Sequence, residues 1–189
     1  MTYTVRSIFY KAVAGLRFVP AILMAFILAS AFNASVLGTA HAQGYLDAAD
    51  WKEIDTPPPP AFDVTKLITF EVSSNSALTY GVDPASVLIS KVDGVLRYVM
   101  VAYSASGSKN VMYEGLRCST GEVKTYARYT PDGRWVPVAE PQWRSVFDIS
   151  TPRHPLRFAR AGACDSGAPV GTVRELVAKL KNPALRFAD

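Results

Sequence analysis

The sequence lacks the short motifs by which many nucleotide-binding proteins and serine hydrolases are identified. Neither G-x-x-x-x-G-K-[ST] nor G-x-G-x-x-G occurs, so no phosphate-binding loop is indicated. A G-x-S-x-G elbow, which would present a nucleophilic serine, is also missing, and the chain has no internal repeat of fixed period. Gly94 and Gly107 are therefore assigned to turns. Nothing in these patterns supports nucleotide binding.

Histidine and cysteine are also scarce, with two residues of each. Only His154 lies after residue 42, and a zinc site built on imidazoles needs more than one. As a general base, His154 would require a nucleophile and an orienting carboxylate brought to it by the fold. Its neighbours Pro152, Arg153 and Pro155 indicate a surface loop, where we expect a solvated histidine. We therefore expect no metal site and no cofactor.

The first 42 residues have the three parts of a cleavable secretory signal peptide. Arg6, Lys11 and Arg17 form a positive segment without acidic residues, and an apolar stretch follows at 18–32. This stretch is shorter than the roughly 20 residues of a transmembrane helix. The small residues of Ala-His-Ala then predict cleavage after Ala42. We expect a periplasmic protein with no stable transmembrane segment after cleavage; an uncleaved membrane anchor is the alternative.

Cleavage would change the charge balance. The whole chain has 20 Lys and Arg against 16 Asp and Glu, but three of the basic residues and none of the acidic ones lie in the first 42. The remaining chain has a net charge of +1. This balance gives no support for nucleic-acid binding, so we expect an envelope protein or another ligand as the partner.

The 147 residues from Gln43 to Asp189 are enough for one domain. Residues 43–63 contain the sequence TPPPP, which favours polyproline II and indicates a proline-rich linker that partly docks. Trp51, just before the prolines, is expected to pack on the domain. Residues 64–189 are predicted to form a single α+β domain.

The domain is organised around residues 86–128, where turn signals separate apolar runs. Val87–Val92 and Val95–Tyr103 flank Asp93-Gly94, a dipeptide typical of two-residue hairpin loops. The next strands are predicted at Asn110–Cys118, Glu122–Tyr129 and Arg134–Val138. Because the connections are too short for parallel crossovers, the strands should form an antiparallel meander. We predict a sheet of five to seven strands, with one face on a core and the other partly wet.

The segments on either side of the meander have weaker patterns. Thr65–Val72 is predicted as a first strand and Leu156–Ala161 as a short last strand. Residues 75–86 and 162–171 are predicted as turn-rich connections, and 140–155 as irregular structure with one helical turn at most. The sequence therefore places the regular structure mainly in the meander.

An amphipathic helix is predicted at Thr172–Leu180. Thr172 and Glu175 match the S/T-x-x-E capping box, in which each side chain satisfies an amide near the start of the helix. The apolar residues are spaced to form one stripe: Val173, Leu176, Val177 and Leu180. Asn182-Pro183 ends the helix. Its apolar stripe should cover one face of the sheet.

The two cysteines, Cys118 and Cys164, are both retained after the predicted cleavage. An even number in an exported protein favours a disulfide. The bridge would close a loop of about 46 residues and, in the chain-entropy model, stabilise the fold by about 4 kcal/mol. A redox-active pair normally has closer spacing, such as C-x-x-C, so we expect a structural disulfide.

The candidate binding residues are Arg97, Tyr98, Glu114 and Arg117. Glu114 lies on a predicted central strand close to Arg117, and a carboxylate paired with an arginine can bind a polar ligand. Such pairs are also common as cross-strand charges worth less than about 1 kcal/mol. Both interpretations remain open.

Basic and aromatic residues are also expected on the wetter face of the sheet, namely Arg97, Lys124 and Arg128 with Tyr98 and Tyr126. Basic residues among aromatics can hold nucleic acid or an anionic glycan. Because the net charge disfavours nucleic acid, a glycan is the better ligand of the two. A solvated face without a ligand is the alternative.

Several short stretches have a recognisable order along the chain: Trp51-x-Glu53, Asp93-Gly94-Val95-Leu96-Arg97-Tyr98, Ser104-Ala105-Ser106-Gly107, Tyr113-Glu114-Gly115-x-Arg117-Cys118 and Asp132-Gly133-x-Trp135. In this order the chain resembles the cryptic neisserial protein-like family, exported bacterial proteins with a domain of unknown function. The resemblance extends from about Trp51 to Cys164. It implies the envelope of a Gram-negative bacterium and supplies no activity or catalytic residue.

These observations predict an exported envelope protein that acts as a non-enzymatic binding or interaction module in the periplasm. The extended, proline-rich N-terminal segment is consistent with a partner role. The alternative is a small cell-envelope hydrolase that uses His154 or Glu114. A purely structural role is a third possibility that the sequence does not separate from the first.

Overall fold

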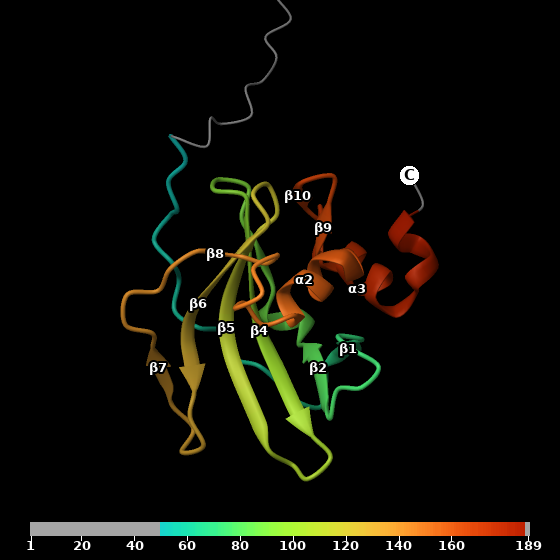
Figure 1. Cartoon of the computed structure of the whole chain (residues 1–189). Helices are drawn as coiled ribbons and strands as arrows, with labels where there is room; N and C mark the ends of the chain where they lie inside the picture. The colour runs from blue at the N-terminus through green and yellow to red at the C-terminus, as the bar shows by residue number, and fades with distance from the viewer. Residues whose placement is uncertain (1–49, 188–189) are drawn as a thin grey trace, which may run out of the picture. The chain divides into compact units, whose positions relative to one another are not determined.

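The computed structural model describes residues 50–187, in which an antiparallel sheet carries helices on one side (Figure 1). Its strands are β1 (Ile68–Phe70), β2 (Leu78–Val82), β3 (Leu88–Ile89), β4 (Val95–Ser104), β5 (Lys109–Arg117), β6 (Glu122–Tyr129), β7 (Trp135–Pro137) and β8 (Arg144–Ser145). Two further strands, β9 (Cys164–Asp165) and β10 (Ala168–Pro169), form a separate hairpin. The helical elements are η1 (Pro84–Ser86), α2 (His154–Phe158), η2 (Ala159–Ala163), α3 (Val173–Lys181) and η3 (Pro183–Phe187).

The sheet follows the predicted meander through its centre. Its strand order is β1-β2-β4-β5-β6-β7, with β3 paired to β4 and β8 paired to β6. All of these pairs are antiparallel. The α+β class and the meander are therefore confirmed, but within residues 50–187 the sheet has eight strands and not the predicted five to seven, because the short strands β3 and β8 also pair with it. β4 and β5 form its longest pair, with nine residues in register.

The hairpin before β4 differs from its prediction. The expected strand Val87–Val92 is reduced to β3, and the backbone amide of Ser90 bonds the carbonyl of Val95. The loop therefore contains four residues, not the two of Asp93-Gly94, and Gly94 takes up the positive φ at its end. The carboxylate of Asp93 is buried instead of facing solvent, because it accepts hydrogen bonds from Arg97 and from the amide of Ile54. The contact with Ile54 is a tertiary one, which local sequence does not reveal.

Two other predictions are wrong because tertiary pairing outweighs local pattern. Residues 75–86 contain β2, whose flanking turn residues, such as Asp83-Pro84, suggested a loop but which pairs with both β1 and β4. Leu156–Ala161, whose alternating apolar residues suggested a strand, instead forms the end of α2 and part of η2. Phe158 of α2 is fully buried and packs against Phe70 and Tyr98.

The helices cover one face of the sheet and enclose the larger core. This core contains Met100 and Leu116 from the sheet, Phe158 from α2, and Leu176 and Leu180 from α3. α3 begins at the predicted cap, because the Thr172 side chain accepts a hydrogen bond from the amide of Glu175. The predicted helix and its packing on the sheet are therefore confirmed.

A disulfide joins the sheet to the helical side. Cys118, directly after β5, is bonded to Cys164 of β9, and their Cα atoms lie 5.6 Å apart. β9 directly follows η2, so the bridge attaches the α2–η2 segment to the end of a central strand. This is the predicted pairing, and its position is consistent with the predicted structural role.

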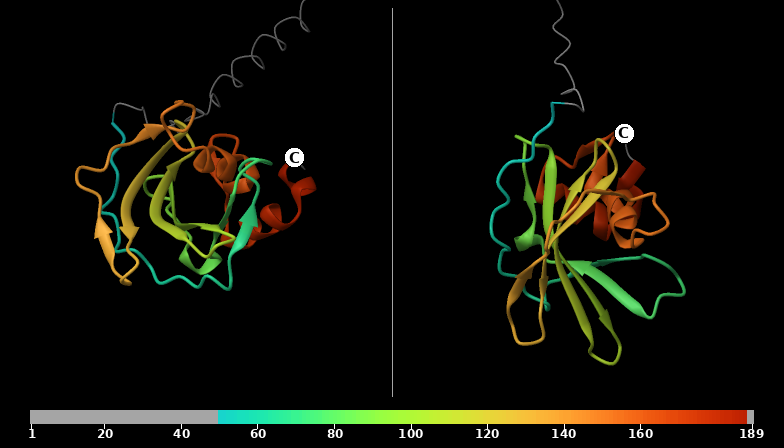
Figure 2. Two further views of the ribbon diagram at one scale, coloured as in Figure 1. Left: turned by 60° about the horizontal axis from the view of Figure 1, so that its bottom comes forward. Right: turned by 60° about the vertical axis from the view of Figure 1, so that its left-hand side comes forward.

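The opposite face of the sheet is covered as well, so the prediction of a partly wet face is wrong. Val99, Val111 and Tyr113 form a second core with Phe62 of the N-terminal segment and Trp135 of β7. Figure 2 shows the segment before β1 running along the side of the curved sheet that faces away from the helices. Residues within the predicted linker therefore contact the domain.

No helix within residues 50–187 is both long enough and apolar enough to cross a membrane. The predicted signal peptide and its cleavage after Ala42 fall outside these residues.

Candidate functional site

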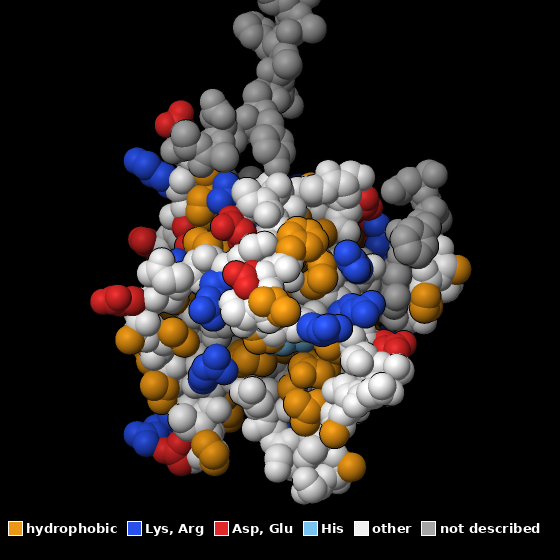
Figure 3. Space-filling view, viewed as in Figure 1, with side chains coloured by type: hydrophobic (Ala, Val, Ile, Leu, Met, Phe, Trp, Pro, Cys, Tyr) orange, Lys and Arg blue, Asp and Glu red, His pale blue; other side chains and the backbone are white. Residues whose placement is uncertain are grey.

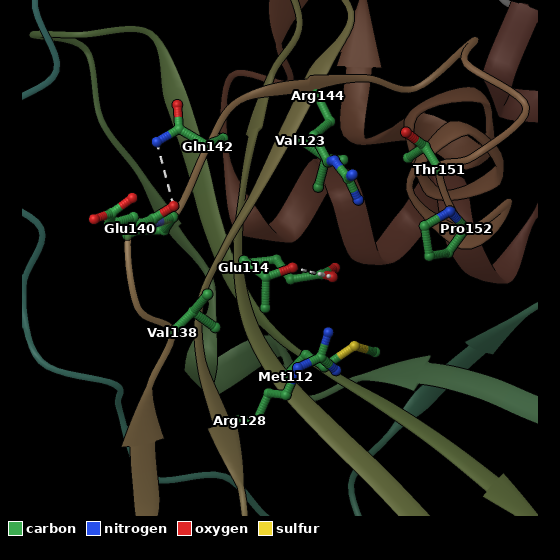
Figure 4. A pocket seen from close by; sticks show the side chains of 12 residues that line it. Met112, Glu114, Val123, Arg128, Val138, Glu140, Gln142, Arg144, Thr151 and Pro152 are labelled. Carbon is green, nitrogen blue, oxygen red and sulfur yellow. Dashed lines mark hydrogen bonds between the residues drawn. The ribbon is translucent and has the colours of Figure 1, made fainter.

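A pocket of about 350 Å³ lies on the helical side of the sheet, beside α2. Strands β5 and β6 supply its floor, and the chain between β7 and α2 supplies its rim (Figure 4). Twelve residues line it: Met112, Glu114, Val123, Thr125, Arg128, Val138, Glu140, Pro141, Gln142, Arg144, Thr151 and Pro152. The pocket thus combines apolar walls with several charged and hydroxyl side chains, as small-molecule sites commonly do.

Glu114 is the buried carboxylate of this floor, with a side chain that is only 2% exposed. Its Oε2 accepts a hydrogen bond from the Tyr98 hydroxyl at 3.1 Å, and its Oε1 accepts one from Thr125 at 3.3 Å. His154 Nε2 lies 3.1 Å from Oε1 and 3.0 Å from Oε2. These contacts satisfy most of the acceptor capacity of the carboxylate and hold it in place.

His154 and Tyr98 are fixed by packing as well as by Glu114. His154 begins α2 and is buried, and its ring stacks on Tyr80 of β2. Burial, together with the charge of Glu114, raises the pKa of Tyr98 well above its usual value. Tyr98 therefore remains a protonated donor. The expectation of a solvated His154 is wrong, because the prolines beside it flank the start of a helix and not an exposed loop.

A β-bulge decides which side chains of β6 reach this pocket. Tyr113 pairs with Ala127, but the next residue, Glu114, pairs with Thr125, so Tyr126 is the extra residue. Beyond the bulge the alternation of β6 is shifted, and Arg128 lies on the same face as Glu114. Simple alternation assigns Arg128 to the opposite face, which explains the error in the predicted grouping. Bulges often re-aim side chains next to functional sites.

Two arginines that form no salt bridge and a buried hydroxyl that forms no hydrogen bond with the described residues border the pocket. Arg128 and Arg144 form no salt bridge with residues 50–187, and basic side chains gather on the face seen in Figure 3. Hydrogen bonds lower the pKa of Asp148, and the charge of Arg144, which lies close to it, contributes to this lowering. Thr151 is 6% exposed, and its Oγ1 has no hydrogen-bond partner among the same residues. In Figure 4, Arg144 and Thr151 lie on one side of Glu114 and Arg128 on the other.

The other predicted site residues belong to a polar cluster on the opposite face. Arg97 is fully buried and donates to Asp93 at 2.7 Å and to Glu53 at 3.3 Å. Arg117 lies over the ring of Trp51, 3.8 Å from its centroid. The four predicted residues therefore do not share one face: Tyr98 and Glu114 contact each other, while Arg97 and Arg117 lie across the sheet from them.

Glu53 is the centre of that second cluster. Its two oxygens accept hydrogen bonds from five donors: Arg97, Thr56, Tyr126, Lys124 and Trp143. Burial would raise the pKa of Glu53, but the bonds from Lys124 and Tyr126 outweigh burial and lower it. These contacts attach the N-terminal segment to β4, β6 and the chain before β8. The cluster therefore has a structural role: it holds the N-terminal segment against the sheet.

Sequence reasoning identified Glu114 and Tyr98 but missed Arg144 and Thr151. Both missed residues lie in a segment with no periodic pattern, and Thr151 is brought to the pocket only because α2 packs beside it. The sequence offered no specific signal for Arg144, because other charged and polar residues also occur in this proline-containing stretch. These residues include Glu140, Gln142 and Asp148.

The arrangement is suited to binding a polar molecule. Among residues 50–187, no serine or cysteine forms a hydrogen bond with His154, and no group of three His, Cys, Asp or Glu is placed to hold a metal ion. Glu114 already accepts from Tyr98, Thr125 and His154, which reduces its capacity to take a proton from a substrate. The charged and hydroxyl groups around the open space can still form hydrogen bonds to a ligand.

One family of known proteins matches the chain. The model of the CNP1-like family matches residues 46–181, which is more than half of the chain and includes all residues of the pocket. No curated protein and no solved structure gives a significant match.

Proposed function

The chain belongs to the CNP1-like family, a family of uncharacterised bacterial proteins, and from this premise we propose that it is an exported, non-enzymatic binding module of the cell envelope. We further propose that this family is the cryptic neisserial protein-like family that the sequence resembles. The binding site is the pocket above Glu114. Its ligand is a small molecule or a polar group presented by an envelope partner.

The observation that carries this proposal is the unused polar capacity of the pocket. Arg128, Arg144 and Thr151 border about 350 Å³ of open space: among the residues described, the two arginines form no salt bridge, and the Thr151 hydroxyl has no hydrogen-bond partner. A buried hydroxyl without a partner is destabilising by roughly 1–3 kcal/mol, so a ligand that satisfied it would recover part of that free energy. Protein groups satisfy most of the other polar groups at the pocket floor.

Export and a periplasmic location are supported by two independent features. The sequence has the predicted signal peptide, and the Cys118–Cys164 disulfide is of the kind that persists in an oxidising compartment. Fractionation of cells that express the full chain should recover the protein in the periplasm. Mass spectrometry should show Gln43 as its first residue; a cytoplasmic protein that retains residues 1–42 would contradict this part of the proposal.

Binding is tested by thermal unfolding of the purified protein with a panel of cell-wall fragments, glycans, amino acids and lipids. A ligand at 100 times its dissociation constant should add about 2.7 kcal/mol, which corresponds to several degrees for a domain of this size. Val138→Trp should fill the pocket and remove the shift. Val136→Trp, an exposed position on β7 outside the pocket, is the matched control. No shift with any compound would contradict a small-molecule ligand.

One observation favours the alternative of a small hydrolase. His154 and Glu114 contact each other beside a pocket, as a general base and its orienting carboxylate would. This alternative predicts turnover of ester or cell-wall substrates that is lost in His154→Asn. If the wild-type protein binds such compounds but leaves them intact, the hydrolase is excluded.

A further inference from the structure

We propose that the ligand is a small organic anion that also carries hydroxyl groups, such as an acidic sugar. This inference rests on the proposed binding function and specifies its ligand. The anionic group would be held by Arg128 and Arg144, and the hydroxyl groups would bond Thr151 and Glu114.

The anionic group is inferred from the two arginines. Arg128 from β6 and Arg144 from β8 border the same pocket, and neither is neutralised by a salt bridge within residues 50–187. Guanidinium groups bind carboxylate or phosphate oxygens through charge-assisted hydrogen bonds. Glu140 also lines the rim, but its carboxylate points away from Glu114 in Figure 4. Between the arginines the pocket is therefore suited to negative charge.

The hydroxyl groups are inferred from Thr151 and Glu114. The Thr151 hydroxyl can both donate and accept, and it is nine-tenths buried without a protein partner. Glu114 accepts from Tyr98, Thr125 and His154, which leaves capacity for about one more donor. A carboxylate only accepts when ionised, so the ligand group beside it must donate. Hydroxyl groups of the ligand can supply a donor to Glu114 and a partner to Thr151, whereas a second anionic group would be repelled by Glu114.

The size of the pocket sets the scale of the ligand. A volume of about 350 Å³ lies at the small end of known ligand sites, which is suitable for one sugar ring and its substituents. The apolar side chains of Met112, Val123 and Val138 can pack on the carbon faces of such a ring. A long polymer would have to present a terminal residue to the pocket.

The test uses isothermal titration of the full-chain protein, purified as the cell produces it, with matched probes. Glucuronate and glucose 6-phosphate carry an anionic group and hydroxyls, glucose carries only hydroxyls, and glutarate carries only carboxylates. We expect glucuronate or glucose 6-phosphate to bind at least tenfold more tightly than glucose or glutarate, and the better of the two identifies the anionic group. Arg128→Ala and Arg144→Ala should each weaken that binding by about tenfold or more.

Thr151→Val separates a binding role from a structural one. Removal of an unpartnered hydroxyl should leave the melting temperature of the free protein unchanged or higher, while binding weakens by about three- to tenfold. Arg174→Ala, an exposed change on α3, is the control that should alter neither.

The outcomes distinguish this inference from the proposed function. If glucose or glutarate binds as well as the acidic sugars, or if both arginine variants bind normally, the ligand is not an anionic polyol. The proposal that the pocket binds a ligand would still stand. Glutamate is added as a zwitterionic probe; if it binds more tightly than the acidic sugars, the ligand is a zwitterion and the inference is overturned. If Val138→Trp leaves the binding of every probe unchanged, the pocket itself is not the site and both proposals fail.

Discussion

Two carboxylates, the partly exposed Glu53 and the buried Glu114, lie on opposite faces of the same sheet and have different surroundings. Each accepts a hydrogen bond from a tyrosine, and each also contacts a basic side chain: Lys124 for Glu53 and His154 for Glu114. Around Glu53, however, five donors from four parts of the chain converge on the two oxygens. Glu114 has fewer donors and lies beside open space bordered by arginines that form no salt bridge.

The difference shows how a structural carboxylate can be distinguished from a candidate binding group. A carboxylate whose charge is satisfied entirely by the protein attaches segments to one another, and Glu53 attaches the N-terminal segment to the sheet. A carboxylate beside unpartnered donors has capacity left for another molecule.

Loss of the disulfide should lower the unfolding free energy most. It should loosen mainly the α2–η2 segment, which lies on the same face of the sheet as Glu114. The bridge closes a loop of 46 residues and attaches the segment that carries His154. The double variant Cys118→Ala/Cys164→Ala should lose about 4 kcal/mol of unfolding free energy in urea titration. Hydrogen exchange should increase more in residues 154–163 than in 51–56; equal increases would contradict a local role on this side.

The variant Glu53→Gln should destabilise the fold by about 3 kcal/mol. It removes the charge that compensates Lys124 and Arg97, and it places an amide donor against other donors. Urea unfolding measures the loss, and ligand binding should be unchanged once the protein is folded. Asp55→Asn, an exposed change in the same segment, is the control. A loss below about 1 kcal/mol would mean that Glu53 is not the main contact that holds the N-terminal segment on the sheet.

Gly115→Ala should cost about 1–3 kcal/mol through overpacking. A Cβ atom at Gly115 would lie 2.3 Å from the Tyr126 hydroxyl, which donates to Glu53. The ring would have to move and its bond to Glu53 would be disturbed. The control is Ala105→Ser, in an exposed turn. Gly107→Ala in the same turn is unsuitable, because Gly107 has a positive φ. Wild-type stability in Gly115→Ala would show that Tyr126 adjusts freely.

Acidification should lower the unfolding free energy through Glu53 and Asp93, and this effect should be smaller than those of the variants above. Burial opposes ionisation of Glu53 and Asp93, but hydrogen bonds from Lys124 and Arg97 respectively hold both pKa values below their ordinary values of 4.5 and 3.8. Groups with lowered pKa values stabilise the fold above those ordinary values, and this stabilisation is lost as pH falls through the lower, folded-state values. Unfolding free energy measured from pH 6 to pH 3 should therefore fall.

Glu53→Gln is also the control for this pH dependence, because it lacks one of the two titrating groups. Its unfolding free energy should fall less steeply between pH 5 and pH 3 than that of the wild type. A slope as steep as in the wild type would assign the acid sensitivity to other carboxylates.

Much of the fold could be predicted because local pattern and tertiary structure agree there. β4, β5 and β6 alternate or are apolar throughout, and α3 has both a cap and an apolar stripe. The paired cysteines followed from their number alone. β2 was not predicted, because turn residues such as Asp83-Pro84 flank its five residues, and its pairing with β1 and β4 is a tertiary contact that leaves no local signal.

The candidate site was predicted only in part for a related reason. Glu114 and Tyr98 were found because they lie on long central strands. Arg128 was assigned to the wrong face because a single extra residue, Tyr126, shifts the alternation of β6. His154 was expected in solvent because its neighbours are prolines, whereas α2 inserts it beside Glu114.

The fold class, the central strands, the C-terminal helix and the disulfide can be read from the sequence, because each depends on residues close together in the chain or on a pair of cysteines that has no other partner. The faces that the charged residues occupy, and the meeting of Glu114, Arg128, Arg144 and Thr151 around one pocket, become visible only in the folded chain. These contacts join residues up to 37 positions apart, and a bulge or a packed helix changes them without leaving a periodic signal in the sequence.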